Sequence, residues 1–387
     1  MLIRFYGWCM VQYYLRHYFN PDFDYLHLKP GGENGSSDVY SLGYVQNVID
    51  GQVLAEIIPL EDAGPDPDPR FMLDKHRFPA GSNTRIDPQY PNYLLAAANG
   101  YVFYLDGRIT VKCLLNVRQD ISFQTGNIFF VGDMAIHGSV RAGFSVQANN
   151  VRIMGMVEGG VVRARRNLMI DGGVRGGAGQ HSLVDAGGKL LSPFLEKVEA
   201  RARDNIVIEK SCLYSTVYAG ASMVVRELAY GGIINAYGSV YVGKQLGNKA
   251  GIPTKIYLGY DPLSIRQLEK IDGIIAQQSQ TITHLNAVAG HLAPETNETS
   301  RKLQALRIQR TQLIKRRDEL WARLSQDESY MHNCRLLVPG RIYPGVELSI
   351  GRAYLTIDQT YDKVMCRLVE HEIIIEHLQH SHLGAPQ

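Results

Sequence analysis

The middle of this 387-residue chain contains acidic residues, whose carboxyl groups could catalyse hydrolysis, but their spacing in the sequence does not form a cluster. Glycoside-cleaving sites need two facing carboxyl groups, and acid–base chemistry needs them in one place. Here the carboxylates are scattered singly, at Asp133, Glu158, Asp171, Asp185, Glu196, Glu199, Asp204, Glu209 and Glu227. The sequence contains no GxSxG, HExxH or P-loop motif. We therefore predict no catalytic, cofactor or metal site, and interpret these carboxylates as solvated surface or as hydrogen-bonding groups at turns.

A glycine-rich stretch at 172–179 is the one segment that resembles a phosphate-binding loop. It lacks the Lys-Ser/Thr pair and the helix that such loops require, so a flexible corner explains it better. His181, which follows it, is interpreted as a solvated loop histidine.

Two groups of cationic residues are the strongest candidates for binding a partner. The first basic patch consists of Arg152, Arg163, Arg165, Arg166 and Arg175. The second basic patch consists of Arg301, Lys302, Arg307, Arg310, Lys315, Arg316 and Arg317, with no acidic residue between 301 and 317. Either patch could bind an acidic protein, a phospholipid or a nucleic-acid surface, and the alternative for both is a solvated face with screened charges. The net charge of the whole chain is only +2, which argues against nucleic acid.

The elements that would position the first basic patch repeat every 17 residues. A marker column of small polar residues, each followed by an apolar one, consists of Asp133, Asn150, Asn167, Asn205, Ser222 and Ser239. The step from 167 to 205 is 38 residues, so we place a four-residue insertion around 181–191 and expect Gly188 in the column. An aliphatic column lies three positions after the marker, at Ile136, Ile153, Ile170, Leu191, Ile208, Val225 and Val242. Alanines three positions before the marker form a third column.

This period is too short for helical repeats, which need roughly 33 residues or more, but it fits one coil of a solenoid made of strands. We predict a mainly β fold, a right-handed parallel β-helix of about 17 residues per coil, with alternate side chains pointing inward. Corner positions that need a positive φ or no side chain are occupied by Gly138, Gly155, Gly172 and Gly238. At another corner the marker column is expected to form hydrogen bonds.

The period changes abruptly after Asp261-Pro262, which is a helix N-cap followed by a first-turn proline. Apolar residues then alternate at intervals of three and four along two segments, with Pro294 between them. This pattern predicts an inserted antiparallel α-helical coiled-coil hairpin. Polar residues interrupt both seams, and Gln278 facing Arg310 or Arg317 could set the register of the hairpin.

These patterns divide the chain into five segments. We expect an N-terminal region with a small β cap (1–110), the parallel β-helix (111–260), the hairpin (261–334), C-terminal strands that close the β-helix (335–377) and a tail (378–387). The β cap includes a hairpin that turns at Asp106-Gly107. Open coils expose strand edges, so both ends of a solenoid need covers.

The cysteines indicate a reducing compartment. They are odd in number and form no CxxC pair, at Cys9, Cys113, Cys212, Cys334 and Cys366. The aromatic N-terminus contains no apolar run of roughly 18 residues that could cross a bilayer and lacks the pattern of a secretory signal. We predict a cytoplasmic protein, at the cell pole or peripheral to the membrane.

The sequence resembles the flagellar assembly protein A (FapA) family over about residues 110–357. Three stretches are similar to that family: 125–140 with its Gly-Asp and Gly-Ser-Val words, the solenoid–helix junction 257–262, and the strand 342–351 after the hairpin. The first hundred residues diverge from the family's N-terminal domain. The resemblance implies a link to flagellar assembly, and it supplies no catalytic residues.

The function we predict is a non-enzymatic scaffold that binds protein partners in bacterial flagellar assembly or polar organisation, with a homo-oligomer left open. One alternative is a self-assembling β-helix protein similar to the bactofilins. Another is a carbohydrate-active β-helix enzyme, which the missing acidic cluster disfavours.

Overall fold

The computed structural model describes residues 12–23, 43–177, 182–289, 297–324 and 331–378. The chain divides into two compact units, Met1–Gly187 and Gly188–Gln387. His181 and all but the first residue of the predicted tail lie outside the described residues.

The N-terminal part of the first unit contains two antiparallel β-sheets that share one core. One sheet has the order β4-β1-β3-β6-β5 and the other β2-β7-β8. Their strands are β1 (Tyr13–His17), β2 (Asn47–Val48), β3 (Val53–Pro59), β4 (Met72–Leu73), β5 (Thr84–Ile86), β6 (Tyr93–Ala96), β7 (Gly100–Leu105) and β8 (Arg108–Lys112), with short 3-10 helices at Leu60–Asp62 and Pro69–Phe71. Leu15, Leu94 and Ile109 are buried in the common core. Asp106 and Gly107 connect β7 to β8 with φ values of 52° and 71°, the positive pair of a two-residue hairpin turn.

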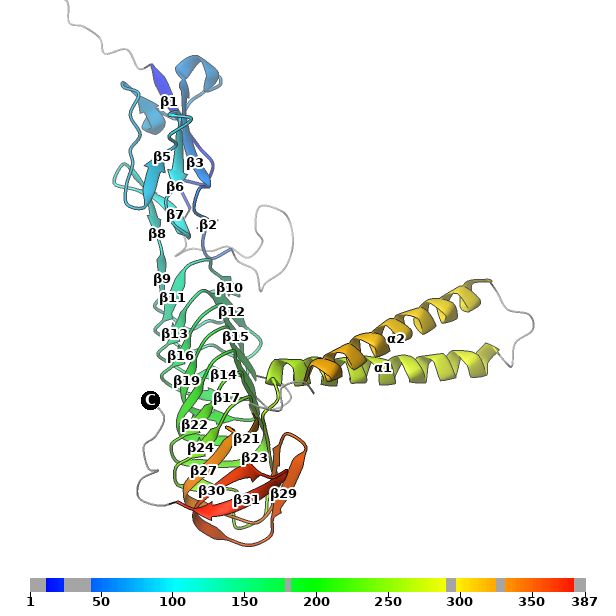
Figure 1. The fold of residues 1–387 in the computed structure, drawn as a ribbon. Helices are drawn as coiled ribbons and strands as arrows, with labels where there is room; N and C mark the ends of the chain where they lie inside the picture. The colour runs from blue at the N-terminus through cyan, green and yellow to red at the C-terminus, as the bar shows by residue number, and fades with distance from the viewer. Residues whose placement is uncertain (1–11, 24–42, 178–181, 290–296, 325–330, 379–387) are drawn as a thin grey trace, which may run out of the picture. The chain divides into compact units, whose positions relative to one another are not determined.

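The rest of the first unit is a stack of coils in which three short strands form three parallel ladders (Figure 1). Ladder 1 contains β9 (Leu114–Val117), β11 (Asp133–Ile136), β13 (Val151–Ile153) and β16 (Leu168–Ile170). Ladder 2 contains the bridges at Ile121 and Val140, then β14 (Val157–Glu158) and β17 (Val174–Arg175). Ladder 3 contains β10 (Ile128–Phe129), β12 (Ser145–Ala148), β15 (Val161–Ala164) and β18 (Ser182–Ala186). Paired residues such as Val151 and Leu168 are 17 positions apart, so the predicted period is confirmed.

The second unit also contains coils of this kind. Its strands before the helices are β19 (Leu190–Glu196), β20 (Val198–Ala202), β21 (Ile206–Ala219), β22 (Met223–Val225), β23 (Leu228–Ala236), β24 (Val240–Val242), β25 (Gln245–Leu246) and β26 (Thr254–Leu258). Ile206, Met223 and Val240 pair in parallel at intervals of 17 residues. The mainly β solenoid is therefore confirmed in both units, and its right-handed sense stays a prediction.

The aliphatic column forms the interior of the coils. Ile153 and Ile208 are 0% exposed and Ile170 is 1% exposed, because alternation along each short strand sends these side chains inward. Ala202, Ala219 and Ala236 are also aligned and buried. The prediction of inward-pointing stacks is confirmed at these positions.

The predicted register is wrong at one coil. Leu190 pairs with Ile206, so Lys189 and not Gly188 is aligned with Asn205, and Leu191 is not in the inward column. Ser192 takes that place beside Ile208 and is 3% exposed. Paired Val161 and Leu183 are 22 positions apart, so five residues and not four are inserted, earlier than expected, between β17 and β18. The next coil is one residue short, because paired Leu190 and Ile206 are 16 positions apart. A one-residue error in the placement of an insertion reverses which side chains point inward.

The marker column forms hydrogen bonds from coil to coil, as predicted. In the first unit the Asp133 carboxylate accepts a bond from the backbone N–H of Asn150, and the Asn150 side chain accepts one from the N–H of Asn167. In the second unit the Ser222 hydroxyl accepts a bond from the N–H of Ser239. These bonds satisfy backbone donors at a corner where no strand pairing is available.

Two helices and a set of returning strands complete the second unit. Helix α1 (Pro262–Ala289) and helix α2 (Asn297–Leu324) have 28 residues each. The strands after them are β27 (Arg335–Ile342), β28 (Val346–Ile350), β29 (Ala353–Ile357), β30 (Tyr361–Val369) and β31 (Glu372–His377). β27 and β28 add one more parallel coil to β24, β25 and β26, whereas β29 and β30 pair antiparallel with β28 and β27.

Candidate functional site

The two helices form an arm that begins on the coils of the second unit (Figure 1). Asp261 caps α1, because its carboxylate accepts hydrogen bonds from the backbone N–H groups of Leu263 at 3.3 Å and Ser264 at 3.1 Å. Leu268 and Ile271 are 3% and 8% exposed, so the first turns of α1 are packed. The cap and the apolar contacts fix where the arm starts.

Three charged residues form the root of the arm. The Oε1 atom of Glu199 accepts hydrogen bonds from Nε of Arg266, at 2.7 Å, and from Nε of Arg201, at 2.8 Å. Arg266 belongs to α1 and the other two residues to β20, so the ion pairs connect the helix to that strand. One helical turn on, the Tyr218 hydroxyl donates a hydrogen bond of 3.0 Å to Glu269. The side chains of Arg201 and Arg266 are only 12% and 19% exposed, so both ion pairs with Glu199 lie in a largely buried setting.

The environment of the root shifts two pKa values. Burial by itself raises the pKa of Glu199, but hydrogen bonds from Arg266 and Arg201 outweigh it, and the pKa is lowered from its ordinary value of 4.5. Burial, together with the Glu269 carboxylate, raises the pKa of Tyr218. Both shifts keep Glu199 ionised and Tyr218 protonated, which is the combination that the contacts need.

The shifted pKa of Glu199 predicts an acid-sensitive arm. The ionised carboxylate favours the docked arm, so this contribution is complete above pH 4.5 and is lost as the pH falls through the lowered pKa. We expect amides in the first turns of α1 to lose hydrogen-exchange protection on acidification, after correction for the intrinsic exchange rate at each pH. A Glu199→Gln variant cannot titrate at this position and should lack that component, and the same pH profile in both proteins would contradict the assignment.

Contacts between the helices connect the start of one with the end of the other. Arg317 lies 3.9 Å from Asp272, and Arg307 donates a hydrogen bond of 3.4 Å to Asn286. Gln278 and Arg310 lie between these contacts in sequence. The Oε1 atom of Gln278 and the Nε atom of Arg310 are buried and have no hydrogen-bond partner among the described residues. The sequence-based expectation that this polar layer sets the register is compatible with these contacts, and the coiled-coil geometry stays a prediction.

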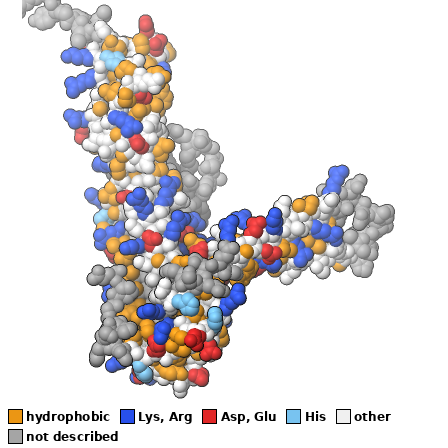
Figure 2. Space-filling model, viewed as in Figure 1, with side chains coloured by type: hydrophobic (Ala, Val, Ile, Leu, Met, Phe, Trp, Pro, Cys, Tyr) orange, Lys and Arg blue, Asp and Glu red, His pale blue; other side chains and the backbone are white. Residues whose placement is uncertain are grey.

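Most of the second basic patch lies exposed on α2 (Figure 2). Arg301, Lys302, Lys315 and Arg316 are exposed and form no ion pair with any described residue. Arg317 differs, because it contacts Asp318 at 2.9 Å. From residue 273 to residue 289, and again from 301 to 317, the sequence of the arm has no Asp or Glu. The stretch from 301 to 317 on α2 therefore carries an excess of positive charge, whereas the stretch from 273 to 289 contains no Lys or Arg.

The first basic patch does not form one stripe. Arg152 is on ladder 1 and is held by Asp171 at 3.0 Å, and Arg175 is on ladder 2 beside Glu158. Arg163 lies on ladder 3, and Arg165 and Arg166 follow it at the next corner. Only these last three are near one another in the chain and exposed, and none of them has an ion-pair partner within the described ranges.

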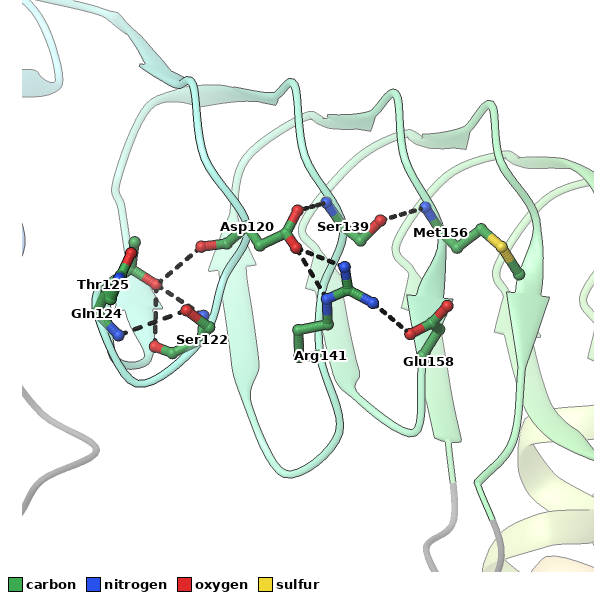
Figure 3. A network of polar contacts seen from close by, with 8 residues as sticks. All are labelled: Asp120, Ser122, Gln124, Thr125, Ser139, Arg141, Met156 and Glu158. Carbon is green, nitrogen blue, oxygen red and sulfur yellow. Dashed lines mark hydrogen bonds and ion pairs between the residues drawn. The ribbon is translucent and has the colours of Figure 1, made fainter.

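Charged residues of neighbouring coils form a network in the first unit that the sequence patterns did not predict (Figure 3). Arg141 donates hydrogen bonds to Asp120 at 2.8 Å and to Glu158 at 2.7 Å. The Asp120 carboxylate also accepts the backbone N–H of Ser139 at 2.8 Å, and this bond and the Arg141 contact lower the pKa of Asp120. The network joins successive coils, so these carboxylates stabilise the stack and are not arranged as a catalytic pair.

The signal that reveals such networks is the period itself. Arg141 and Glu158 are 17 residues apart, and so are the paired residues Glu209 and Arg226 and the pair Glu227 and Lys244. Opposite charges separated by one coil are placed side by side by the parallel ladders. No group of three or more possible metal ligands occurs among the residues that the structure describes.

Residues 114–373 match the family described as the flagellar assembly protein A β-solenoid domain. The match covers more than half of the chain. The chain belongs to the FapA family. Comparisons with curated proteins and with solved structures gave no match.

The FapA match contains the coils, the arm and the returning strands, including the Glu199 root and both basic patches. The two N-terminal sheets precede it. The family description places the protein in flagellar assembly. Neither described helix is long and apolar enough to cross a membrane.

Proposed function

We propose that this FapA-family chain is a non-enzymatic scaffold that binds an acidic surface of a protein partner through the second basic patch. The observation that carries the proposal is a set of four exposed cations that form no ion pair with any side chain that the structure describes, Arg301, Lys302, Lys315 and Arg316, on an arm whose root is fixed by buried contacts. Like charges on one helix repel each other, so an acidic partner would relieve an unfavourable arrangement. Exposed Ile308 and Trp321, at 54% and 50%, offer apolar contacts on the same helix.

Two alternatives are less well supported. Head-to-tail stacking similar to the bactofilins needs open coil edges, but β30 and β29 occupy the outer edges of β27 and β28 in the second unit. A carbohydrate-active enzyme needs facing carboxyl groups, whereas Asp120 and Glu158 both bind Arg141. The isolated cysteines Cys212 and Cys366 are buried and free, which fits the predicted cytoplasmic location, and a position at the cell pole stays a prediction.

Charge reversal on the arm tests the proposal. We expect the variant Arg301→Glu/Lys302→Glu/Lys315→Glu/Arg316→Glu to lower recovery of the partner in affinity capture from the native bacterium by about tenfold or more, because attractive pairs become repulsive. Wild-type recovery should also fall as salt is added. Substitution is preferable to deletion of the arm, since deletion would uncover the surface beneath Leu268 and Ile271.

A matched control reverses Arg163, Arg165 and Arg166, the clustered part of the first basic patch, and should leave recovery unchanged. If recovery of the partner fell only with this control variant, the binding site would be assigned to ladder 3 and not to the arm. Full recovery with both variants would reject an electrostatic partner site on either patch.

A further inference from the structure

A groove in the first unit lies outside both basic patches. It has a volume of about 730 Å³, and β7 and β9 contribute residues to its walls. Aromatic side chains line much of it, including Tyr101, Phe103 and Tyr104. Leu105 and Leu114, which also line it, are 58% and 47% exposed. The groove is therefore open and largely apolar.

One wall of the groove is an unpaired strand edge. β9 pairs in parallel with β11, where Cys113 O accepts the N–H of Asp133 and Val117 O accepts the N–H of His137. Backbone groups of alternate residues point to opposite sides of a strand, so the N–H and C=O groups of Leu114 and Asn116 point away from β11. No other described strand pairs with β9, and both residues line the groove.

The neighbouring edge of the same coil is capped, in contrast to β9. Asn47 lies beside β10, where its side-chain Nδ2 donates to Phe129 O at 2.8 Å and its Oδ1 accepts the N–H of Val131 at 3.0 Å. One amide side chain thus replaces the missing strand at this point. The first coil is therefore capped at β10 but not at β9, so the edge of β9 is available for pairing with another strand.

The charge of the groove restricts its occupant. Lys112 and Arg118 line it, are exposed, and form no ion pair with a described residue. The Lys112 ammonium lies 5.0 Å from the centre of the Phe103 ring. No Asp or Glu is among the described lining residues. A ligand with carboxylates and apolar or aromatic side chains would complement these groups.

We propose that the groove binds an extended acidic peptide segment of a partner protein, which adds a strand to the free edge of β9. Only a peptide offers backbone donors and acceptors at the spacing of Leu114 and Asn116, which favours it over a nucleic acid. Alternate side chains of the added strand would contact the aromatic wall, and acidic ones would reach Lys112 and Arg118. This site is distinct from the arm and does not depend on the function proposed for it.

Binding of a labelled (Glu-Tyr)5 peptide to the full chain, measured by fluorescence anisotropy, tests the proposal. We expect saturable binding to the wild type, and at least about tenfold weaker binding for (Lys-Tyr)5 and for (Glu-Tyr)5 N-methylated at alternate residues. The N-methylated peptide lacks backbone N–H donors at the methylated residues but keeps the charge of (Glu-Tyr)5. Absence of saturable binding of (Glu-Tyr)5 to the wild type would overturn the proposal.

Three variants locate the contact. Asn116→Pro removes one edge N–H that does not face β11 and should weaken binding by about tenfold, whereas Asn116→Ala keeps that N–H and should bind normally. Arg118→Glu, an exposed substitution that keeps the strand intact, should also weaken binding by about tenfold. Arg108→Glu, on β8 outside the lining, is the charge control and should have no effect. The arm charge-reversal variant should still bind the peptide, so failure of one proposal is distinguishable from failure of the other.

Other occupants give different results. Equal binding of (Glu-Tyr)5 and of single-stranded oligo-dT would overturn the peptide assignment in favour of a general anion site. A wild-type dimer in sedimentation equilibrium that dissociates on Asn116→Pro substitution would assign the edge to a second copy of the chain and would also overturn it.

Discussion

Replacement of Gly155 by valine is expected to lower the free energy of unfolding by about 3 kcal/mol or more, measured by urea denaturation. A Cβ atom at this position would lie 2.5 Å from the carbonyl oxygen of Gly138, the equivalent residue one coil earlier. Ser139 Oγ, also 2.5 Å away, belongs to a side chain, but the O and C atoms of Gly138 are backbone atoms of a coil already fixed by strand pairing and cannot move aside. The corner therefore requires glycine for close approach between coils.

Gly273 supplies the matched control for this prediction. It lies on exposed α1, and a Cβ there would meet no heavy atom within 4 Å. Gly273→Ala should stabilise α1 by up to about 1 kcal/mol, since alanine favours the helix. A Gly155→Val variant that is as stable as the wild type would mean that the coils are not stacked as described.

Removal of the Glu199 carboxylate is expected to have the largest effect on the arm. Glu199→Ala removes the carboxylate that the Arg201 and Arg266 side chains, 12% and 19% exposed, both contact, and should destabilise the docked arm by about 1–3 kcal/mol. The Glu199 side chain is 32% exposed, so solvent screening keeps the cost below that of a fully buried pair. Hydrogen exchange along α1 and denaturant unfolding measure it.

Glu209→Ala is the control for Glu199→Ala. Glu209 and Arg226 are 52% and 57% exposed, so removal of this ion pair should cost less than about 1 kcal/mol and leave exchange in α1 unchanged. Equal effects of the two substitutions would show that the root contacts do not hold the arm.

The sequence predicted those parts of the fold that follow from a repeated local pattern. Inward aliphatic residues such as Ile153 and Ile170 and hydrogen-bonding markers such as Asn150 recur at the same point of most coils, so each supports the others. The error at Leu191 arose where the pattern is interrupted, because neither the length nor the place of an insertion is encoded by the period.

The candidate site depended more on tertiary structure. The cations of the second basic patch could be found from the sequence, because one exposed helix carries them without intervening acidic residues. The arrangement of the first basic patch could not be predicted from the sequence in this way. Arg152, Arg175 and Arg163 lie on three different ladders, and each ladder faces a different direction. Nearness in sequence gives little information about which face of a coil a residue occupies.

By itself, the sequence determined the 17-residue coil, the inward columns and the existence of two helices, because alternation and periodicity act on neighbouring residues and need no distant partner. Only the tertiary structure decided the contact of Arg266 with Glu199, 67 residues away, and the open edge of β9 beside the aromatic groove. Those features arise from how finished elements pack, and the free energy of that packing depends on shape and burial that no local pattern records.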